Sequence, residues 1–389
     1  MSNKRILMFT MGNWSHSNGA IVRAMQSKLP QWEIIVIDLL QAFRKNKRGV
    51  LACVQDIPLL AWHSLQEGKF DRTSVLHAPA TAAYINRLAH KLTREYQPAF
   101  TMQTTTRFNA GGGEVPHFTV IDSTLAAVRQ RYRELFNSSE RSLDRVHAFQ
   151  QRVYDSSTGI FTMGRYVRDS LVRDYHVAPH RAVAIGAGPN IVLGKRSNVV
   201  GSQDILFVGT NWERKGGPPL LEAFRRIRRK YPQARFNIVG CSPEISEPGV
   251  KVIGRVPREE LHRYFREARL FALPTIHEAF GIAFVEALHF GLPIIGTSIG
   301  AIPEMAEDGV NGFTVEPGDA DSMAKALDRL FGDDALALRF GEASFQRSSQ
   351  FTWDYAGSLL CDKMLSLAGN DKPTVTRPVT RHVEQRLAS

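Results

Sequence analysis

The stretch PTIHEAFGIAFVEALHFGLPIIGTS, residues 274–298, contains a loop, a helix and a strand in close succession. It follows the apolar run Leu270–Leu273, which predicts a preceding strand. A helix is expected to begin near Ile282 and to end before the Gly-Leu-Pro turn, and Pro293–Thr297 predicts the next strand. Because strands separated by a helix usually pair in parallel, this order favours a parallel sheet covered by helices.

The same alternation extends outward over both halves of the chain. In the first half, strands are expected at Arg5–Thr10, Glu33–Asp38, Ala99–Thr104, His117–Ile121 and Gly159–Met163. In the second half, the further strands are Asp204–Gly209 and Arg235–Gly240, again with helical periodicity between them. The sequence therefore predicts an α/β protein with two doubly wound, Rossmann-like domains.

The pattern relaxes over residues 190–203 into a polar stretch that contains glycine. We therefore expect an N-terminal domain over residues 1–195 and a C-terminal domain over residues 196–368. The last segment, 369–389, has two prolines and no clear period, which is typical of a flexible tail. Two such domains in sequence would form a cleft, where ligands usually bind.

Composition excludes several other classes of protein. The chain has 389 residues, of which 43% are hydrophobic and 22% charged, so a largely disordered chain, a fibrous repeat and a small disulfide scaffold are disfavoured. No apolar run approaches the roughly 18 residues that a membrane span needs. The N-terminus is interpreted as a first strand, not as a signal peptide. The three cysteines are far apart and lack metal-type spacing. These features predict a soluble, cytoplasmic protein.

The net charge of +11 comes from the N-terminal half, while the C-terminal half is close to neutral. The basic residues are densest at Arg44, Lys45, Lys47 and Arg48, and again at Arg129, Arg131 and Arg133. One interpretation is an ordinary solvated surface. The other is that this half faces something anionic, such as a membrane surface, a phosphorylated lipid or an acidic polymer. Nucleic acid is disfavoured because neither cluster lies in a recognisable nucleic-acid-binding module.

Two carboxylates eight positions apart, Glu278 and Glu286, flank the start of the helix near Ile282. Gly281 would let a ligand approach the backbone, and the first N–H groups of the helix would face phosphate or sugar oxygens. Carboxylates accept hydrogen bonds in pairs, as the vicinal hydroxyls of a sugar require. The alternative interpretation is that both are acids that favour the helix dipole.

This ordered run resembles the retaining nucleotide-sugar glycosyltransferases of family 4, which carry an E-x7-E motif followed by G-x-P and P-E-x4-G-x-x-G patterns. The matching positions are Glu278, Phe280, Gly281, Glu286, Gly291, Pro293, Gly296, Thr297, Pro303, Glu304, Gly309 and Gly312. The resemblance covers most of residues 204–345 and is looser before them. It implies the GT-B architecture, in which two Rossmann-like domains face each other across a deep cleft.

The resemblance also implies roles for residues of the second domain. Glu278 would bind the hexose hydroxyls, Glu286 the ribose hydroxyls, and Lys215 the departing diphosphate, whose charge a cation compensates. The family's usual arginine after the strand glycine is replaced by Thr210, and Arg214 is the alternative source of a guanidinium. The remaining donor-binding positions are Gly209, the backbone of Ala279, Phe280, Gly281 and Ile282 at the sugar, and Arg255 and Val256 at the base.

Acceptor recognition is expected in the first domain. His16, Asn18 and Gly19 follow the first strand, where the resembled family often has a Gly-Gly pair. The family's usual histidine near the reacting carbon corresponds to Asp122, at the end of a central strand. Asp122 would orient an acceptor hydroxyl or the donor sugar, or it would cap the following helix together with Ser123 and Thr124.

No metal and no cofactor are expected, because in the resembled fold protein cations and helix termini stabilise the leaving group. Asp319-Ala320-Asp321 is formally a D-x-D motif, but it follows Pro-Gly and opens a helical pattern, so helix capping explains it better. No phosphate-binding P-loop, nucleophile elbow or HExxH helix is present in the sequence.

The sequence thus predicts a retaining glycosyltransferase that moves a hexose from a nucleotide diphosphate sugar to an acceptor hydroxyl. The basic first half suggests a lipid-linked or other anionic acceptor in glycan or polysaccharide synthesis, reached by peripheral contact at the inner face of the membrane. A soluble phosphosugar or polysaccharide would also fit. The alternatives are a nucleotide-sugar-binding partner protein with weak or no turnover, and a phosphorylase or epimerase with the same fold.

Overall fold

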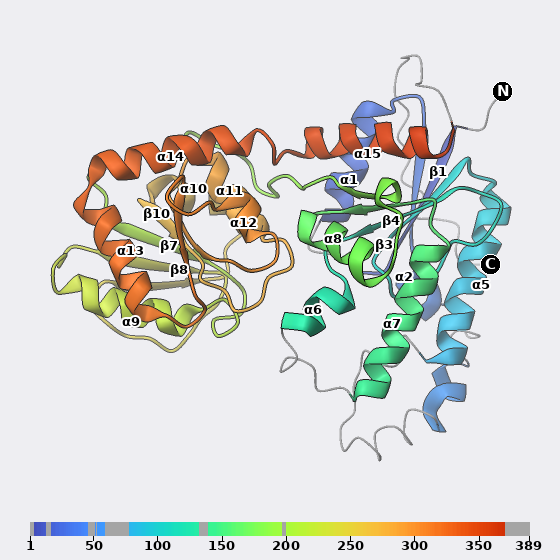
Figure 1. Cartoon of the computed structure of the whole chain (residues 1–389), viewed down its shortest axis with the longest axis horizontal. Coiled ribbons are helices and arrows are strands. Elements are labelled where there is room, and N and C mark those ends of the chain that lie inside the picture. Colours follow the sequence, from blue (N-terminus) through green and yellow to red (C-terminus); the bar gives the residue numbers. More distant parts are fainter. Residues whose placement is uncertain are drawn as a thin grey trace. The chain divides into compact units, whose positions relative to one another are not determined.

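The computed structural model describes residues 4–12, 17–45, 51, 53–58, 78–131, 139–196 and 200–369 (Figure 1). The chain forms two compact units. The first comprises Met1–Ile185 with Gly357–Ser389, and the second comprises Gly186–Ala356. Each unit contains a six-stranded sheet flanked by helices, so the predicted pair of Rossmann-like domains is confirmed.

The sheet of the first unit has the strand order β2-β1-β3-β4-β5-β6. All neighbouring strands pair in parallel. The strands are β1 (Arg5–Thr10), β2 (Glu33–Asp38), β3 (Phe100–Thr104), β4 (His117–Ile121), β5 (Gly159–Thr162) and β6 (Ala182–Ala184). The helices are α1 (Ser17–Lys28), α2 (Leu39–Arg44), α5 (Pro79–Tyr96), α6 (Leu125–Arg131), α7 (Glu140–Asp155), α8 (Arg165–Asp174) and the short η2 (Pro179–Arg181).

The second sheet repeats this plan with the order β12-β11-β10-β7-β8-β9, again parallel. Its strands are β7 (Asp204–Val208), β8 (Arg235–Val239), β9 (Val250–Gly254), β10 (Leu270–Ala272), β11 (Ile294–Thr297) and β12 (Gly312–Val315). Its helices are α9 (Gly217–Arg228), α10 (Arg258–Glu267), α11 (Ile282–His289), α12 (Ile302–Met305), α13 (Ala320–Gly332) and α14 (Asp334–Ser348).

The strand order reverses direction once in each sheet. In the second unit the chain runs outward from β7 to β9 and then returns to the other side of β7 with β10. In the first unit the corresponding point lies between β1 and β3. Ligands of doubly wound sheets bind outside the carboxyl ends of the strands at such switch points, because the loops on either side diverge there.

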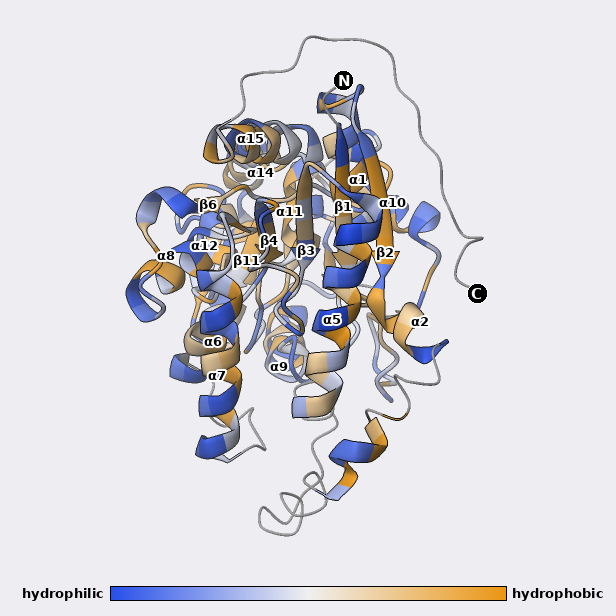
Figure 2. Cartoon of the chain, turned by 90° about the vertical axis from the view of Figure 1, so that its right-hand side faces the viewer, coloured by the Kyte–Doolittle hydropathy of each residue, from blue (hydrophilic) through white to orange (hydrophobic). Residues whose placement is uncertain are grey.

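The central strands are apolar because helices cover both of their faces. Residues 6–9 of β1 (ILMF) have no exposed surface, and neither do Phe271 and Ala272 of β10. Figure 2 shows β1 and β2 mostly in the hydrophobic colour, whereas α7 carries hydrophilic residues along its length. The buried strands hold their carboxyl-end loops on a rigid base.

The chain returns to the first unit through its last described helix, α15 (Trp353–Leu367). Gly357 packs so closely on α1 that a Cβ there would lie 2.7 Å from that of Ala24, and Leu360 and Met364 are buried. The second unit begins at Gly186, ten residues before the boundary expected at 195/196, and ends at Ala356, before the expected residue 368. Sequence periodicity does not indicate the second difference, because it arises from packing of the C-terminal helix α15 on α1. The expected tail, 369–389, lies outside the described residues except for Gly369.

Candidate functional site

The switch point of the second sheet brings together two loops from distant parts of the sequence. The loop after β7 runs from Gly209 to Gly216, and the loop after β10 runs from Leu273 to Gly281. Gly216 has a φ of 74°, and a Cβ there would lie 1.9 Å from the carbonyl oxygen of Pro274. Only glycine permits this approach, and it places the start of α9 against the end of β10.

Hydrogen bonds join the same two loops. The carbonyl of Arg214 accepts from the Thr275 hydroxyl at 2.9 Å and from the Ile276 N–H at 3.0 Å. In return, the Arg214 guanidinium donates from Nη1 to the carbonyl oxygen of His277 at 2.7 Å. Arg214 therefore braces the loop that carries Glu278.

Lys215 and Glu278 form an ion pair between Nζ and Oε2 at the centre of this site. Only 12% and 13% of their side-chain surfaces are exposed. Burial lowers the pKa of Lys215, and the carboxylate of Glu278 opposes that shift. Gly209 leaves room for the lysine, because a Cβ there would lie 2.9 Å from Lys215 Cγ. The structure thus brings together two residues that the sequence separates by 63 positions.

The helix α11 begins directly after this pair. Its N-cap, Gly281, has a φ of 96°, and no side chain caps the first turn. Around this helix start, Ala279 and Ile282 are partly exposed, whereas Phe280 is buried. An uncapped helix start beside a lysine favours the oxygen atoms of an anionic or hydroxylated ligand.

Glu286 lies on the second turn of α11 and is only 4% exposed. Its Oε1 accepts from the backbone N–H of Asn190 at 3.2 Å. Burial raises its pKa to about 7, although the hydrogen bond from Asn190 and the charge of Arg258 counteract the shift. Glu286 is thus buried on the second turn of the helix, and Glu278 is paired with Lys215 in the loop before it.

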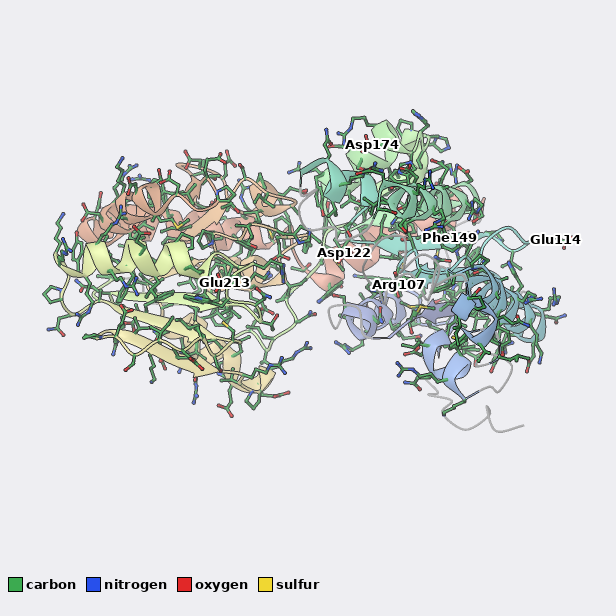
Figure 3. All side chains as sticks on the ribbon, turned by 90° about the horizontal axis from the view of Figure 1, so that it is seen from below. Arg107, Glu114, Asp122, Phe149, Asp174 and Glu213 are labelled. Atoms are coloured by element: carbon green, nitrogen blue, oxygen red, sulfur yellow. The ribbon has the colours of Figure 1, made fainter. Side chains whose placement is uncertain are left out.

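The other expected donor positions lie at neighbouring strand ends. Thr210 and Arg255 are exposed, and Val256 is partly exposed after β9. A pocket of about 430 Å³ lies on the same edge of the sheet, lined by Trp212, Glu213 and residues 241–245 (Glu213 is labelled in Figure 3). Sequence reasoning missed the 241–245 segment, although its position directly after a predicted strand was a usable signal.

Gly300 is a second residue that sequence reasoning missed. Its φ is 55°, and a Cβ there would lie 2.2 Å from the carbonyl oxygen of Glu278 and 3.0 Å from that of Ala279. The loop after β11 therefore packs against the backbone of the loop that carries Glu278. The hydroxyl of Thr297, at the end of β11, also donates to the Thr275 carbonyl at 2.8 Å.

The expected acceptor residues of the first unit are less closely grouped in the structure. His16 lies outside the described residues. Asn18 and Gly19 are in the first turn of α1, where Asn18 Nδ2 donates to the carbonyl of Gly12 at 3.1 Å. Asp122 follows β4 and is partly exposed (Figure 3). The hydroxyl of Thr124 accepts from the Ala127 N–H in the first turn of α6 at 3.1 Å.

Asp319, the first residue of the formal D-x-D motif, caps the helix α13. Asp319 Oδ1 accepts from the Ser322 N–H at 3.0 Å, and Asp321 forms an ion pair with Arg226. Within the described ranges, no three His, Cys, Asp or Glu side chains gather as they would around a metal ion. In the same part of the chain, no helix has the length and apolar character needed to cross a membrane.

Two parallel sheets, the second with converging loops at its switch point, define a two-domain α/β protein. Comparisons with known proteins show which class of protein it resembles. Residues 202–333 match the family model described as "Glycosyl transferases group 1". The D-inositol 3-phosphate glycosyltransferase of Corynebacterium aurimucosum is 27% identical over 267 residues, which are 61% of this chain and 63% of that protein. The protein of the same name from Corynebacterium diphtheriae is 26% identical, with 61% and 62% covered. The chain thus spans less than two thirds of these curated relatives.

Solved structures show the same architecture over nearly the whole chain. Sucrose-phosphate synthase from Thermosynechococcus elongatus has a TM-score of 0.69 at 15% identity, covering 94% of this chain and 99% of its own. Anabaena Alr3699/HepE, in complex with UDP and glucose, has a TM-score of 0.62 at 16% identity, with 93% and 99% covered. The predicted two-domain Rossmann-like fold is confirmed, and the family model and the curated relatives support the resemblance to glycosyltransferases.

Proposed function

We propose that the chain is a retaining glycosyltransferase that moves a hexose from a nucleotide diphosphate sugar to an acceptor hydroxyl. The observation that carries the proposal is the mostly buried ion pair of Lys215 and Glu278 at the switch point of the second sheet, directly before the helix that carries the buried Glu286. This set offers a cation, a carboxylate beside an uncapped helix start, and a second carboxylate one helical turn further on.

In this proposal each group meets one part of the donor. Lys215 faces the diphosphate and stabilises the charge that develops as it departs. Glu278 and the backbone from Ala279 to Ile282 accept and donate hydrogen bonds at the hexose. Glu286 accepts from the ribose hydroxyls, and Arg255 and Val256 contact the base through their backbone. No metal and no cofactor takes part.

The ion pair between Lys215 and Glu278 makes donor binding an exchange of partners. The two side chains are mostly buried and neutralise each other. An incoming sugar nucleotide would supply phosphate oxygens to Lys215 and hydroxyls to Glu278, so each charge keeps a partner as the pair opens. This exchange avoids leaving a buried charge unpaired, which would cost several kcal/mol.

The acceptor is proposed to bind at the first unit, with Asp122 orienting its hydroxyl and with Asn18, Gly19 and His16 nearby. The positive charge of the N-terminal half supports an anionic acceptor. The curated relatives are named for D-inositol 3-phosphate, which is anionic. A phosphorylated polyol or a lipid-linked glycan reached from the cytoplasmic face of a membrane fits this charge. The resembled family has no clearly placed protein nucleophile, so in this proposal retention comes from attack by the acceptor on the side from which the diphosphate leaves.

A nucleotide-sugar-binding protein without turnover is the second candidate. Two departures from the resembled family favour it, namely Thr210 in place of an arginine and Asp122 in place of a histidine. A phosphorylase or an epimerase with the same fold is less well supported, because an epimerase needs an acid and a base around the donor carbon.

Turnover separates the two candidates. Wild type would be incubated with UDP-, GDP- and ADP-sugars, first with water alone and then with D-inositol 3-phosphate as the first trial acceptor. We expect slow hydrolysis with water and faster transfer with a suitable acceptor, with the anomeric configuration of the product retained by NMR. Glu278→Ala should abolish both reactions. If wild type binds a nucleotide sugar but neither wild type nor Glu278→Ala turns it over, the result would support the binding protein instead.

A further inference from the structure

Two loops lie next to each other at the carboxyl edge of the first sheet. One follows β3 and includes Thr105 to Arg107, and the other follows β4 and includes Asp122 to Thr124. The strands pair in parallel with Thr104 opposite Val120, so the loops leave the sheet at the same level. Arg107 and Asp122 are both labelled in Figure 3.

A single buried side chain, Gln150 of α7, bonds to the loop after β3 and to the first residue of α6, which directly follows the loop after β4. Its Nε2 donates to the hydroxyl of Thr106 at 2.9 Å, on the loop after β3. Its Oε1 accepts from the backbone N–H of Leu125 at 3.0 Å, at the start of α6. The same oxygen accepts from the hydroxyl of Tyr175 at 2.6 Å. Gln150 is 8% exposed, so these bonds are shielded from water.

The start of α6 is consequently held by side chains of other elements. The Leu125 N–H donates to Gln150, the Ala126 N–H to the Tyr175 hydroxyl at 3.2 Å, and the Ala127 N–H to Thr124. The three N–H groups are thus engaged within the protein, unlike the uncapped first turn of α11. The residues just before α6 are fixed as well, because the Tyr166 hydroxyl donates to the carbonyl of Asp122 at 2.9 Å.

The loop after β3 is held in a strained shape. Thr105 has a φ of 80°, a conformation that costs free energy for a β-branched residue. Its N–H donates to the Val120 carbonyl at 3.1 Å, and its carbonyl accepts from Gln103 Nε2 at 2.8 Å. Gln103 Nε2 also donates to the Phe108 carbonyl at 2.9 Å. Strain that several bonds maintain is typical of functional loops.

The buried ring of His117 orients Gln103. Its Nε2 lies 3.0 Å from Gln103 Oε1, and its Nδ1 lies 2.9 Å from the Thr101 hydroxyl. Burial lowers the pKa of His117 to about 3, so the ring is neutral at physiological pH. Since the amide oxygen can only accept, Nε2 carries the proton and Nδ1 accepts from Thr101.

We propose that Gln150 is a positioning residue that holds the Thr105–Arg107 loop and the Asp122 loop at a fixed separation, so that an acceptor can contact both. The inference rests on the proposed function, in which this edge of the first sheet takes the acceptor. Gln150 acts only through Thr106 and the start of α6. Its loss should therefore impair the acceptor and spare the donor, which binds to the second unit.

The test compares two variants with a matched control. Gln150→Leu removes all three bonds, whereas Thr106→Val keeps the shape of the threonine and removes only the bond to the loop. Gln151→Ala is the control on the same helix, because Gln151 bonds instead to Asp155 and to the Tyr175 carbonyl. The probes are the sugar nucleotide that wild type binds best and D-inositol 3-phosphate as acceptor. Transfer to this acceptor and hydrolysis of the sugar nucleotide by water are both measured. Hydrogen exchange of the backbone amides is measured on the ligand-free proteins.

For Gln150→Leu we expect faster exchange at Leu125 and Ala126, at least a tenfold rise in the acceptor KM, and donor affinity within twofold of wild type. Thr106→Val should raise the acceptor KM less, and Gln151→Ala should change neither value. If wild type does not use this acceptor, another phosphorylated polyol that wild type uses replaces it. Hydrolysis by water, which needs no acceptor, should stay within twofold of wild type in all three variants.

Two outcomes would overturn the inference. One is unchanged protection at Leu125 and Ala126 in Gln150→Leu, which needs no substrate to observe. The other is faster exchange at Leu125 and Ala126 without any change in transfer to the acceptor. Equal losses of donor affinity and of transfer would count in the same way, because they would show no effect specific to the acceptor. Absence of nucleotide-sugar binding by wild type would instead contradict the proposed function, so the two failures are distinguishable.

Discussion

At the scale of single residues, Glu278 and Glu286 share one motif but have different surroundings. Glu278 is paired with Lys215, whereas Glu286 is buried and accepts a backbone N–H from Asn190. The two carboxylates were predicted because they flank an expected helix start, and Lys215 was predicted from the family resemblance. The sequence could not show that Lys215 and Glu278 pair, or that Arg214 braces the loop, since these contacts arise only when β7 and β10 become neighbours.

The pKa of Glu286 predicts a pH dependence of donor binding. Its folded-state value of about 7 lies above the ordinary 4.5, and only the carboxylate accepts two hydroxyl hydrogen bonds. Donor affinity should therefore rise from pH 6 to pH 8. In Glu286→Gln the affinity should be roughly tenfold or more lower at pH 8 and nearly independent of pH, because a bond to a charged group is worth about 1.5–3 kcal/mol. Calorimetric titration with a sugar nucleotide at several pH values checks this, and a flat wild-type profile would argue against it.

The same group predicts the opposite trend for stability without ligand. Because folding raises this pKa, the stability that Glu286 contributes is complete below pH 4.5 and is lost as pH rises through 7. Glu286→Gln resembles the protonated form, so it should match wild type near pH 4.5. At pH 8 it should be more stable by a free energy of unfolding on the order of 3 kcal/mol. Urea unfolding at the two pH values measures the difference, and a less stable variant at pH 8 would contradict the assignment.

At the scale of elements, the loops that support α11 decide the geometry of the site. Strands β7, β8, β10 and β11 were predicted because they are apolar and central. Strands β6, β9 and β12 were missed because β6 has three residues and the other two are edge strands with mixed burial or a glycine start. Gly300 was missed for a related reason, since its contact with Glu278 depends on how the loop after β11 packs.

Gly300→Ala tests this support, with Gly309→Ala as the matched control. Both glycines have a left-handed backbone, with φ values of 55° and 72°, so in both substitutions the backbone strain alone should cost roughly 1–2 kcal/mol of stability. Only at position 300 would the new Cβ collide with the Glu278 backbone, because nothing lies within 4 Å at position 309. We expect Gly300→Ala to weaken nucleotide-sugar binding at least tenfold and Gly309→Ala to leave it unchanged. Equal effects of the two substitutions on binding would show that the support is not specific.

At the scale of the whole molecule, the sequence predicted two Rossmann-like domains but placed their borders differently. Helix α15 joins the first unit through Gly357, and no periodicity in the sequence indicates which unit a terminal helix packs on. The division of charge, by contrast, is visible in the sequence alone, because it needs only a count of residues in each half.

This charge division predicts how the protein binds to lipid. The whole chain should sediment with vesicles that contain anionic lipid and should be released at about 0.5 M salt, where screening shortens the range of charge interactions. Arg44→Glu with Lys45→Glu should weaken the association, since both side chains are exposed on the positive unit. The control, Arg229→Glu with Arg339→Glu, reverses two exposed charges of the second unit and should have little effect. Binding that is equal on neutral vesicles would rule out the electrostatic explanation.

The central claim is that the switch point of the second sheet binds a nucleotide diphosphate sugar. The most direct test is thermal stabilisation of the whole chain by UDP-, GDP- and ADP-sugars and their free nucleotides, without added metal. A ligand that binds only the folded state stabilises it by RT ln(1 + [L]/Kd), or about 2.7 kcal/mol at a hundredfold excess over Kd. We predict a clear rise in Tm with the sugars of one base, lost in Lys215→Ala and Glu286→Ala and kept in Arg225→Ala, which disrupts only an exposed ion pair. No rise in Tm with any nucleotide or sugar nucleotide would contradict the account.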